Sequence, residues 1–153
     1  IACIGVQVED VGTCFGSWGI GEGAMLDTFV DFAASMTRNH VVRWAGHSLN
    51  RFDFPIIRTR LIHHGHAQAH RLFAFSKWER ERVLDLADDW WFPNNGQCPS
   101  LATMAAIVGV DAPEGSGADV GGQWARGEYD LIERHCLSDL RVTEQVCNAL
   151  GES

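Results

Sequence analysis

The chain has 153 residues, of which 46% are hydrophobic, and its formal net charge is −8. This length allows one domain with a real core and is too short for two ordinary domains, and the hydrophobic content excludes a disordered chain. The negative charge argues against a protein that coats nucleic acid through bulk charge, although an enzyme can still hold a strand end in a local site that contains cations.

The sequence predicts no membrane span and no disulfide framework. It contains no apolar run of about 18 residues. It opens without Met on a strand-like stretch, residues 1–6, with no basic region before it that would indicate a signal peptide. The cysteines are odd in number, scattered and without a CxxC pair (Cys3, Cys14, Cys98, Cys136 and Cys147). We therefore expect reduced thiols in a cytoplasmic protein.

The first predicted elements are a β-hairpin and a helix. Residues 1–8 and 13–18 are typical of two strands that flank a turn. Residues 22–37 carry apolar side chains at helical spacing, which predicts an amphipathic helix that ends at Asn39 and His40.

A strand, a turn and a helix follow. Residues 41–46 are mostly apolar rather than alternating, which is typical of a parallel strand covered on both faces. Pro55 suits the first turn of a helix, predicted from about residue 55 to residue 64 and stopped by Gly65. Asp53 is then expected at the end of a buried strand, where ligands bind in open α/β sheets. The alternative is that Asp53 or Asn50 merely caps the helix.

Four histidines lie within residues 63–71 (His63, His64, His66 and His70). Zinc binding is one interpretation, but the spacing matches no familiar ligand set, so an exposed His-rich loop is favoured. With nearby arginines, Arg58 among them, this loop could form a basic edge that contacts phosphate.

Next comes a short apolar run at residues 83–86 that could end a strand. Trp90 and Trp91 follow and could stack on bases, although aromatic residues more often simply pack. Residues 93–96 read as a turn.

The last third of the chain is predicted to be mainly helical. Ser100 is expected to cap a helix that Gly109 ends. A loop at residues 111–119 precedes a short helix at residues 120–126, and a long helix begins at residues 127–130 and runs to residue 150.

His135 and Asp139 are four residues apart in this long helix and therefore share one face. Val142, Val146 and Leu150 follow Asp139 at helical spacing, which predicts an aspartate on the core-facing stripe. A buried carboxylate needs a positive partner, a metal or a proton. For one aspartate alone an ion pair or a loop cap is the simpler explanation, but with Asp53 also at a strand end a shared metal is favoured.

These residues resemble the DEDD 3′-5′ exonucleases. Asn50-Arg51-Phe52-Asp53 is similar to their second motif, and His135-x-x-x-Asp139 has the spacing of the third motif in the subgroup that uses Tyr-x-x-x-Asp. The similarity is strongest to the predicted exonucleases related to the exonuclease domain of family-B DNA polymerases. It covers roughly residues 1–150.

The resemblance implies one α/β domain over residues 1–153, with a ribonuclease-H-like mixed sheet flanked by helices. It implies hydrolysis of 3′-terminal phosphodiesters, with single-stranded DNA as the expected substrate and DNA replication or repair as the expected process. Two Mg²⁺ or Mn²⁺ ions would be held by acidic side chains. Asp53 and Asp139 would be metal ligands, and His135 would orient or deprotonate the attacking water. The corresponding substrate-binding candidates are Ser48, Asn50, Phe52 and Arg58.

Two departures from the family pattern leave a second function open. In the subgroup with this spacing, the position of His135 is a Tyr. The sister subgroup does use a His, but it places one more residue between the His and the Asp. The family's first motif, Asp-x-Glu on a central strand, has no counterpart here, since Glu9-Asp10 has the wrong spacing. We expect the natural protein to have further residues upstream of Ile1 that supply this strand, buried and bearing Asp-x-Glu, or residues 1–8 to pair directly with residues 41–46. The alternative function is a non-catalytic module that binds nucleic-acid ends or has a structural role.

Overall fold

The computed structural model describes residues 1–66, 68–76, 79–89 and 98–152. The chain divides into two compact units, one formed by Ile1–Met25 with Pro99–Ser153 and the other by Leu26–Cys98. Both contain helices and strands, so the α/β class is confirmed. Among the described residues, no helix has the length and apolar run needed to cross a bilayer.

The first unit begins with the predicted hairpin. Strands β1 (Cys3–Val8) and β2 (Val11–Gly16) pair antiparallel, with Cys3 opposite Gly16 and Gly5 opposite Cys14. Glu9 adopts a positive φ of 51° in the tight turn between the strands. The hairpin prediction is therefore confirmed, with the second strand two residues earlier than expected.

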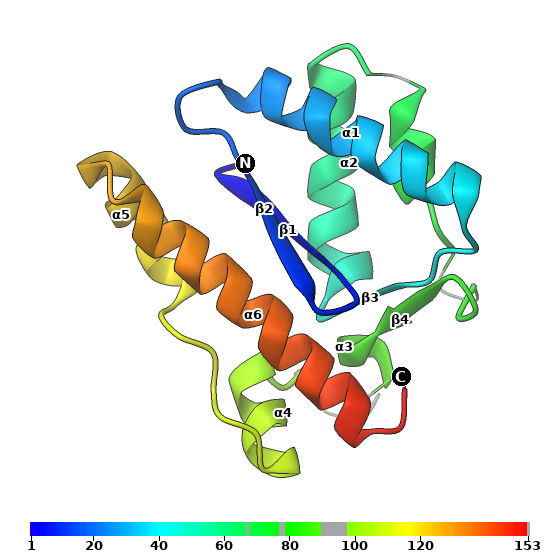
Figure 1. The fold of residues 1–153 in the computed structure, drawn as a ribbon, viewed down its shortest axis with the longest axis vertical. Coiled ribbons are helices and arrows are strands. Elements are labelled where there is room, and N and C mark those ends of the chain that lie inside the picture. Colours follow the sequence, from blue (N-terminus) through cyan, green and yellow to red (C-terminus); the bar gives the residue numbers. More distant parts are fainter. Residues whose placement is uncertain (67, 77–78, 90–97, 153) are drawn as a thin grey trace. The chain divides into compact units, whose positions relative to one another are not determined.

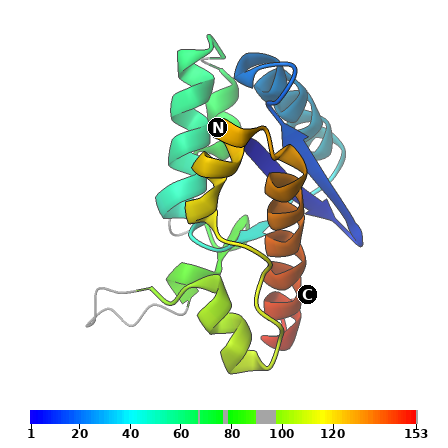
Figure 2. The ribbon, with the colours of Figure 1, turned by 90° about the vertical axis from the view of Figure 1, so that its left-hand side faces the viewer.

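The remaining elements of this unit are helical: α4 (Leu101–Val108), the 3₁₀ turn η3 (Gly117–Asp119), α5 (Val120–Arg126) and α6 (Tyr129–Ala149). All three predicted helices are confirmed. Ser100 caps α4 by accepting the Thr103 N–H, and Gly109 follows it in the left-handed conformation. Helix α6 packs along both strands of the hairpin and against α4 and α5 (Figures 1 and 2).

Glycine leaves room for α6 on the hairpin face that meets this helix. A Cβ atom at Gly5 would lie 2.5 Å from Cys136 Sγ and 3.1 Å from Leu140 Cδ1. Beside it, Gln7 donates a 2.7 Å hydrogen bond to Glu144 further along α6. The absence of side chains therefore lets the helix approach the strands closely.

We expect Gly5→Ala to lower the free energy of unfolding by roughly 1–3 kcal/mol, because the added methyl overpacks the contact with Cys136 and Leu140. Gly12→Ala is the matched control on the same face, since its nearest neighbour, Leu137 Cδ2, is 3.2 Å away and can yield. Urea denaturation of both variants checks this. Equal losses of stability would contradict the close packing at Gly5.

In the second unit, β3 (Trp44–Gly46) and β4 (Val83–Asp85) pair in parallel, with Gly46 opposite Asp85. Helix α1 (Glu22–Asn39) spans the boundary of the two units. The other elements here are the π-helical turn η1 (Leu49–Asp53), α2 (Phe54–His63), the 3₁₀ helix η2 (Ala69–Phe73) and α3 (Leu86–Asp89). Buried Phe29 and Phe73 stack 5.2 Å apart in its core.

The helix and the strand predicted for this unit are found, but the strand has different bounds. Pro55 does lie in the first turn of α2, and Gly65 follows the helix with a φ of +87°. The strand predicted over residues 41–46 is shorter, because only its last three residues pair with β4. The turn at residues 93–96, together with Trp90 and Trp91, lies outside the described residues.

The described strands form two separate two-stranded sheets, β1 with β2 and β3 with β4. The direct pairing of residues 1–8 with residues 41–46, which was one of the two expectations, is therefore not found in the described part of the chain.

Candidate functional site

The loop that carries Asn50-Arg51-Phe52-Asp53 is held by a buried carboxylate. Asp85, at the end of β4, is 3% exposed. Its Oδ1 accepts the backbone N–H of Ser48 at 2.8 Å and of Ala87 at 3.1 Å, and its Oδ2 accepts that of Asn50 at 2.8 Å. Because β3 and β4 are parallel, Asp85 sits where the chain leaves β3 and fixes its exit path.

A second carboxylate holds the polar side chains of the same loop. Asp88 Oδ2 accepts a 3.0 Å hydrogen bond from Asn50 Nδ2, and its Oδ1 lies 3.1 Å from the Arg51 guanidinium. Ser48 takes the left-handed conformation with a φ of 63°. The side chain of Asn50 and the backbone of Ser48 thus shape the loop, a role that the substrate-binding prediction did not include.

The loop leaves an aromatic side chain in solvent. Phe52 is 62% exposed, and Asp53 is half-buried at the start of α2. The Asp53 side chain makes no capping hydrogen bond to α2, so the alternative that Asp53 caps this helix is wrong, and the Asn50 side chain donates to Asp88 instead. Its placement at the strand end is also revised, because β3 ends at Gly46 and the π-helical turn intervenes. In α2, Arg58 Nε is buried without a hydrogen-bond partner among the described residues.

We expect Asp85→Ala to lower the free energy of unfolding by roughly 3–5 kcal/mol, because it leaves unpaired the buried N–H of Ala87 and the partly buried N–H groups of Ser48 and Asn50, and an unpaired buried donor costs about 1–3 kcal/mol. Chemical denaturation followed by circular dichroism measures the loss. Asp88→Ala is the control and should cost about 1 kcal/mol or less, since its ion pair with Arg51 is open to solvent. A milder effect at Asp85 than at Asp88 would contradict this role for Asp85.

In the first unit, α6 places His135 beside Asp139, with His135 Nε2 3.6 Å from Asp139 Oδ2. His135 Nδ1 lies 2.7 Å from the carbonyl oxygen of Glu114. A carbonyl oxygen only accepts hydrogen bonds, so Nδ1 carries the proton. In the neutral imidazole the lone pair is then on Nε2, next to the Asp139 carboxylate.

The segment that fixes His135 is itself fastened to α6. The Glu114 N–H donates a 2.9 Å hydrogen bond to Ser138 Oγ, and the Glu114 carboxylate lies 3.7 Å from Arg141. Gly115, with a φ of +79°, passes over the imidazole of His135. The ring is only 15% exposed, so its orientation is well determined by these contacts.

The prediction that Asp139 is buried is wrong, because its side chain is 43% exposed. Val142 and Val146 are buried as expected, but Ser138 takes the inward position instead. On a helix with about 100° per residue, Ser138 lies about 40° from Val142 on one side and Asp139 about 60° on the other. Asp139 is therefore at the edge of the apolar face, where solvent and a cation can reach it.

The structure brings together two of the predicted catalytic residues, His135 and Asp139, in the first unit. Asp53 belongs to the second unit, as do the substrate-binding candidates Ser48, Asn50, Phe52 and Arg58. Partly exposed carboxylates suit Mg²⁺ or Mn²⁺, which prefer oxygen ligands and retain water. The donor chemistry of Asp53 and Asp139 thus fits these ions.

The histidines of residues 63–71 contact different partners. The rings of His63 and His64 meet edge to face at 5.0 Å, whereas His66 Nε2 lies 3.0 Å from Asp27 Oδ1. They form no group of three or more metal-ligating side chains within the described part of the chain.

A cluster of thiols was missed by the sequence reasoning. All five cysteines are thiols rather than disulfides, as predicted, but the ligand atoms of Cys3, Cys14 and Cys136 lie within 4.8 Å of one another. The Cys3 pKa is lowered to about 4, because hydrogen bonds from Cys136 and then from Cys14 stabilise its thiolate. The hairpin register was the available signal, since it sets the two strand cysteines diagonally across the ladder.

The other two thiols keep their protons. The Cys136 pKa is raised, first by its hydrogen bond with Cys14 and then by that with Cys3. For Cys14 the contact with Cys136 lowers the pKa, but the hydrogen bond with Cys3, burial and the charge of Cys3 together raise it to about 12.

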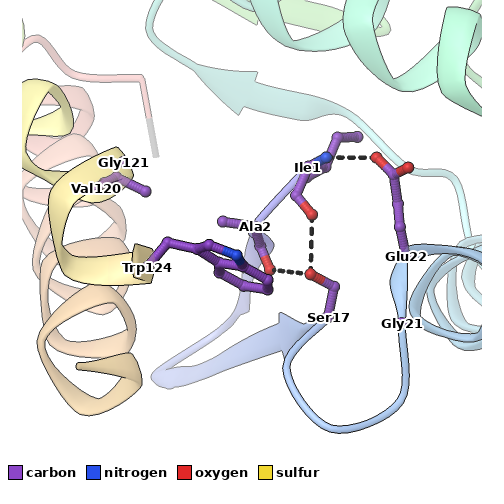
Figure 3. Close-up of a pocket in the computed structure, with 8 residues that line it drawn as sticks. All are labelled: Ile1, Ala2, Ser17, Gly21, Glu22, Val120, Gly121 and Trp124. Atoms are coloured by element: carbon purple, nitrogen blue, oxygen red, sulfur yellow. Dashed lines mark hydrogen bonds and ion pairs between the residues drawn. The ribbon is translucent and has the colours of Figure 1, made fainter. Parts of the chain in front are cut away.

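A pocket of about 410 Å³ also lies in the first unit and is lined by none of the predicted site residues. In Figure 3, Trp124 of α5 points toward Ala2 and Ser17 across it. The Ser17 hydroxyl shares its one proton between the carbonyl oxygens of Ile1 at 3.0 Å and Ala2 at 2.9 Å. Glu22 forms an ion pair with the Ile1 amino group.

No protein-family model, curated protein or solved structure matches the chain.

Proposed function

We propose that the chain is a metal-dependent 3′-5′ exonuclease that hydrolyses the 3′-terminal phosphodiesters of single-stranded DNA, on a ribonuclease-H-like fold. The observation that carries this proposal is the His135–Asp139 pair. It holds a proton-accepting nitrogen 3.6 Å from a solvent-accessible carboxylate, in the spacing of the family's third motif.

Each residue then has a distinct task. His135 Nε2 accepts the proton of the water whose oxygen attacks the terminal phosphorus, while the bond from phosphorus to the 3′ oxygen breaks. The 3′ oxygen leaves with a proton from solvent, and a nucleoside 5′-monophosphate is released. Asp53 and Asp139 would hold Mg²⁺ or Mn²⁺, which when bound neutralises charge on the phosphate and lowers the pKa of water.

The residues proposed to contact the substrate belong to the second unit. The exposed Phe52 can stack on a base of a single strand, which is worth about 1–3 kcal/mol per base. Arg58 carries the positive charge that a phosphate contact needs, and its Nε is buried without a hydrogen-bond partner among the described residues. A local site of this kind is compatible with a net charge of −8.

A second candidate function is a non-catalytic module that binds nucleic-acid ends. It is favoured by a specific observation: the sequence has no Asp-x-Glu. Within the described residues, moreover, the groups of three or more potential ligands include no set of carboxylates. Such a module would bind a 3′ end without hydrolysing it.

A 5′-labelled single-stranded oligonucleotide distinguishes the two functions. With Mg²⁺ or Mn²⁺ we expect its stepwise shortening, and with excess chelator none. Asp111→Asn, in the exposed loop after α4, is the matched carboxylate control and should remain fully active. Binding of the intact oligonucleotide without shortening supports the non-catalytic module, and neither binding nor shortening rules out both.

A further inference from the structure

The thiol cluster of Cys3, Cys14 and Cys136 is built from three elements of one unit. Cys3 is on β1, Cys14 on β2 and Cys136 on α6. The register pairs Cys14 with Gly5, so the two strand cysteines are diagonal neighbours on the same face of the hairpin. Cys136 reaches this face from the helix, directly above Gly5.

The close approach depends on Gly5. Its missing side chain leaves the space into which Cys136 Sγ projects, 2.5 Å from where a Cβ would be. The three sulfur atoms thus converge on a point between hairpin and helix, with all pairs within 4.8 Å. All three residues are partly exposed, so an ion from solvent can enter.

We propose that Cys3, Cys14 and Cys136 form a binding site for a thiolate-preferring divalent cation of the Zn²⁺ class. Three sulfurs around one Zn²⁺ at about 2.3 Å in a tetrahedral arrangement are about 3.8 Å apart, so the cluster needs to contract by 1 Å at most. Water completes the fourth position, and the thiol protons are released to the solvent on binding.

This site differs in chemistry from the carboxylate site of the proposed exonuclease. Thiolates select soft or borderline cations, whereas Mg²⁺ and Mn²⁺ prefer carboxylate oxygen and water. The inference therefore does not depend on nuclease activity. The cation would join the hairpin to α6 and so stabilise the first unit.

Cobalt titration tests the site directly. The purified chain is reduced, stripped of metal and titrated with Co²⁺, whose sulfur-to-metal charge-transfer band reports thiolate ligation. We expect saturation at one equivalent, displacement by Zn²⁺ and no competition from Mg²⁺. Loss of a residue that only supports a metal ligand typically weakens metal binding by about 10–100-fold. Cys3→Ser and Cys14→Ser each remove a ligand itself, so each should weaken Co²⁺ binding by more than this.

Cys98→Ser and Cys147→Ser are the matched controls and should bind Co²⁺ like the unmodified chain, since neither residue belongs to the cluster. Zn²⁺ should also raise the melting temperature of the chain and of both controls, but not that of Cys3→Ser. Circular dichroism establishes that each variant is folded. The proposal is overturned if the unmodified chain shows no charge-transfer band, or if the band persists in both Cys3→Ser and Cys14→Ser.

Discussion

Asp139→Asn and Asp53→Asn are each expected to abolish nearly all nuclease activity while the fold survives. An amide cannot supply the negative charge that a divalent cation requires of these ligands. Loss of a residue that merely supports a ligand typically costs about 10–100-fold, so the loss of a ligand should exceed this range. The measurement is the initial rate of oligonucleotide shortening at saturating Mn²⁺.

Two controls make the result specific. Asp111→Asn carries the same chemical change at an exposed loop position and should keep its activity. Circular dichroism and urea denaturation should show Asp53→Asn and Asp139→Asn folded, because both side chains are partly exposed. Undiminished activity in either folded variant would refute the assignment of that residue as a metal ligand.

The second large effect is expected at His135. As the group that accepts the water proton, it should contribute about 10²–10⁴-fold to the rate. His135→Ala should therefore lower kcat and leave the affinity for Mn²⁺ largely unchanged. His135→Tyr introduces the tyrosine of the Tyr-x-x-x-Asp exonuclease motif and should retain appreciable activity.

His63→Ala, which removes an exposed imidazole from the end of α2, is the matched control. The dependence of kcat on pH distinguishes a catalytic role of His135 from a structural one. Removal of His135 changes the acidic limb of this profile only if His135 accepts the proton. If folded His135→Ala turns over at the full rate, His135 only packs the segment at Glu114 against α6.

Local signals in the sequence predicted most of the elements. The cap at Ser100, the left-handed Gly109 and the apolar spacing of residues 22–37 depend on near neighbours, and the structure confirms all three. The hairpin and the position of Pro55 are equally local. Short-range geometry and backbone preference were sufficient there.

Long-range arrangements could not be predicted in the same way. The role of Asp85 depends on the register of β3 against β4. This register places Asp85 opposite Gly46, which lies 39 residues earlier in the chain. The thiol cluster needs the hairpin register and also the rotation of α6 about its axis. That rotation also decided the exposure of Asp139, since Ser138 rather than Asp139 faces the core.

The most direct test of the account is the polarity of degradation. One single-stranded oligonucleotide is labelled at its 5′ end in one sample and at its 3′ end in another, and both are incubated with the chain and Mn²⁺. The account predicts a gradually descending ladder from the 5′ label and immediate release of a labelled mononucleotide from the 3′ label. Intact oligonucleotide in both samples, or mononucleotide released first from the 5′ label, would contradict it.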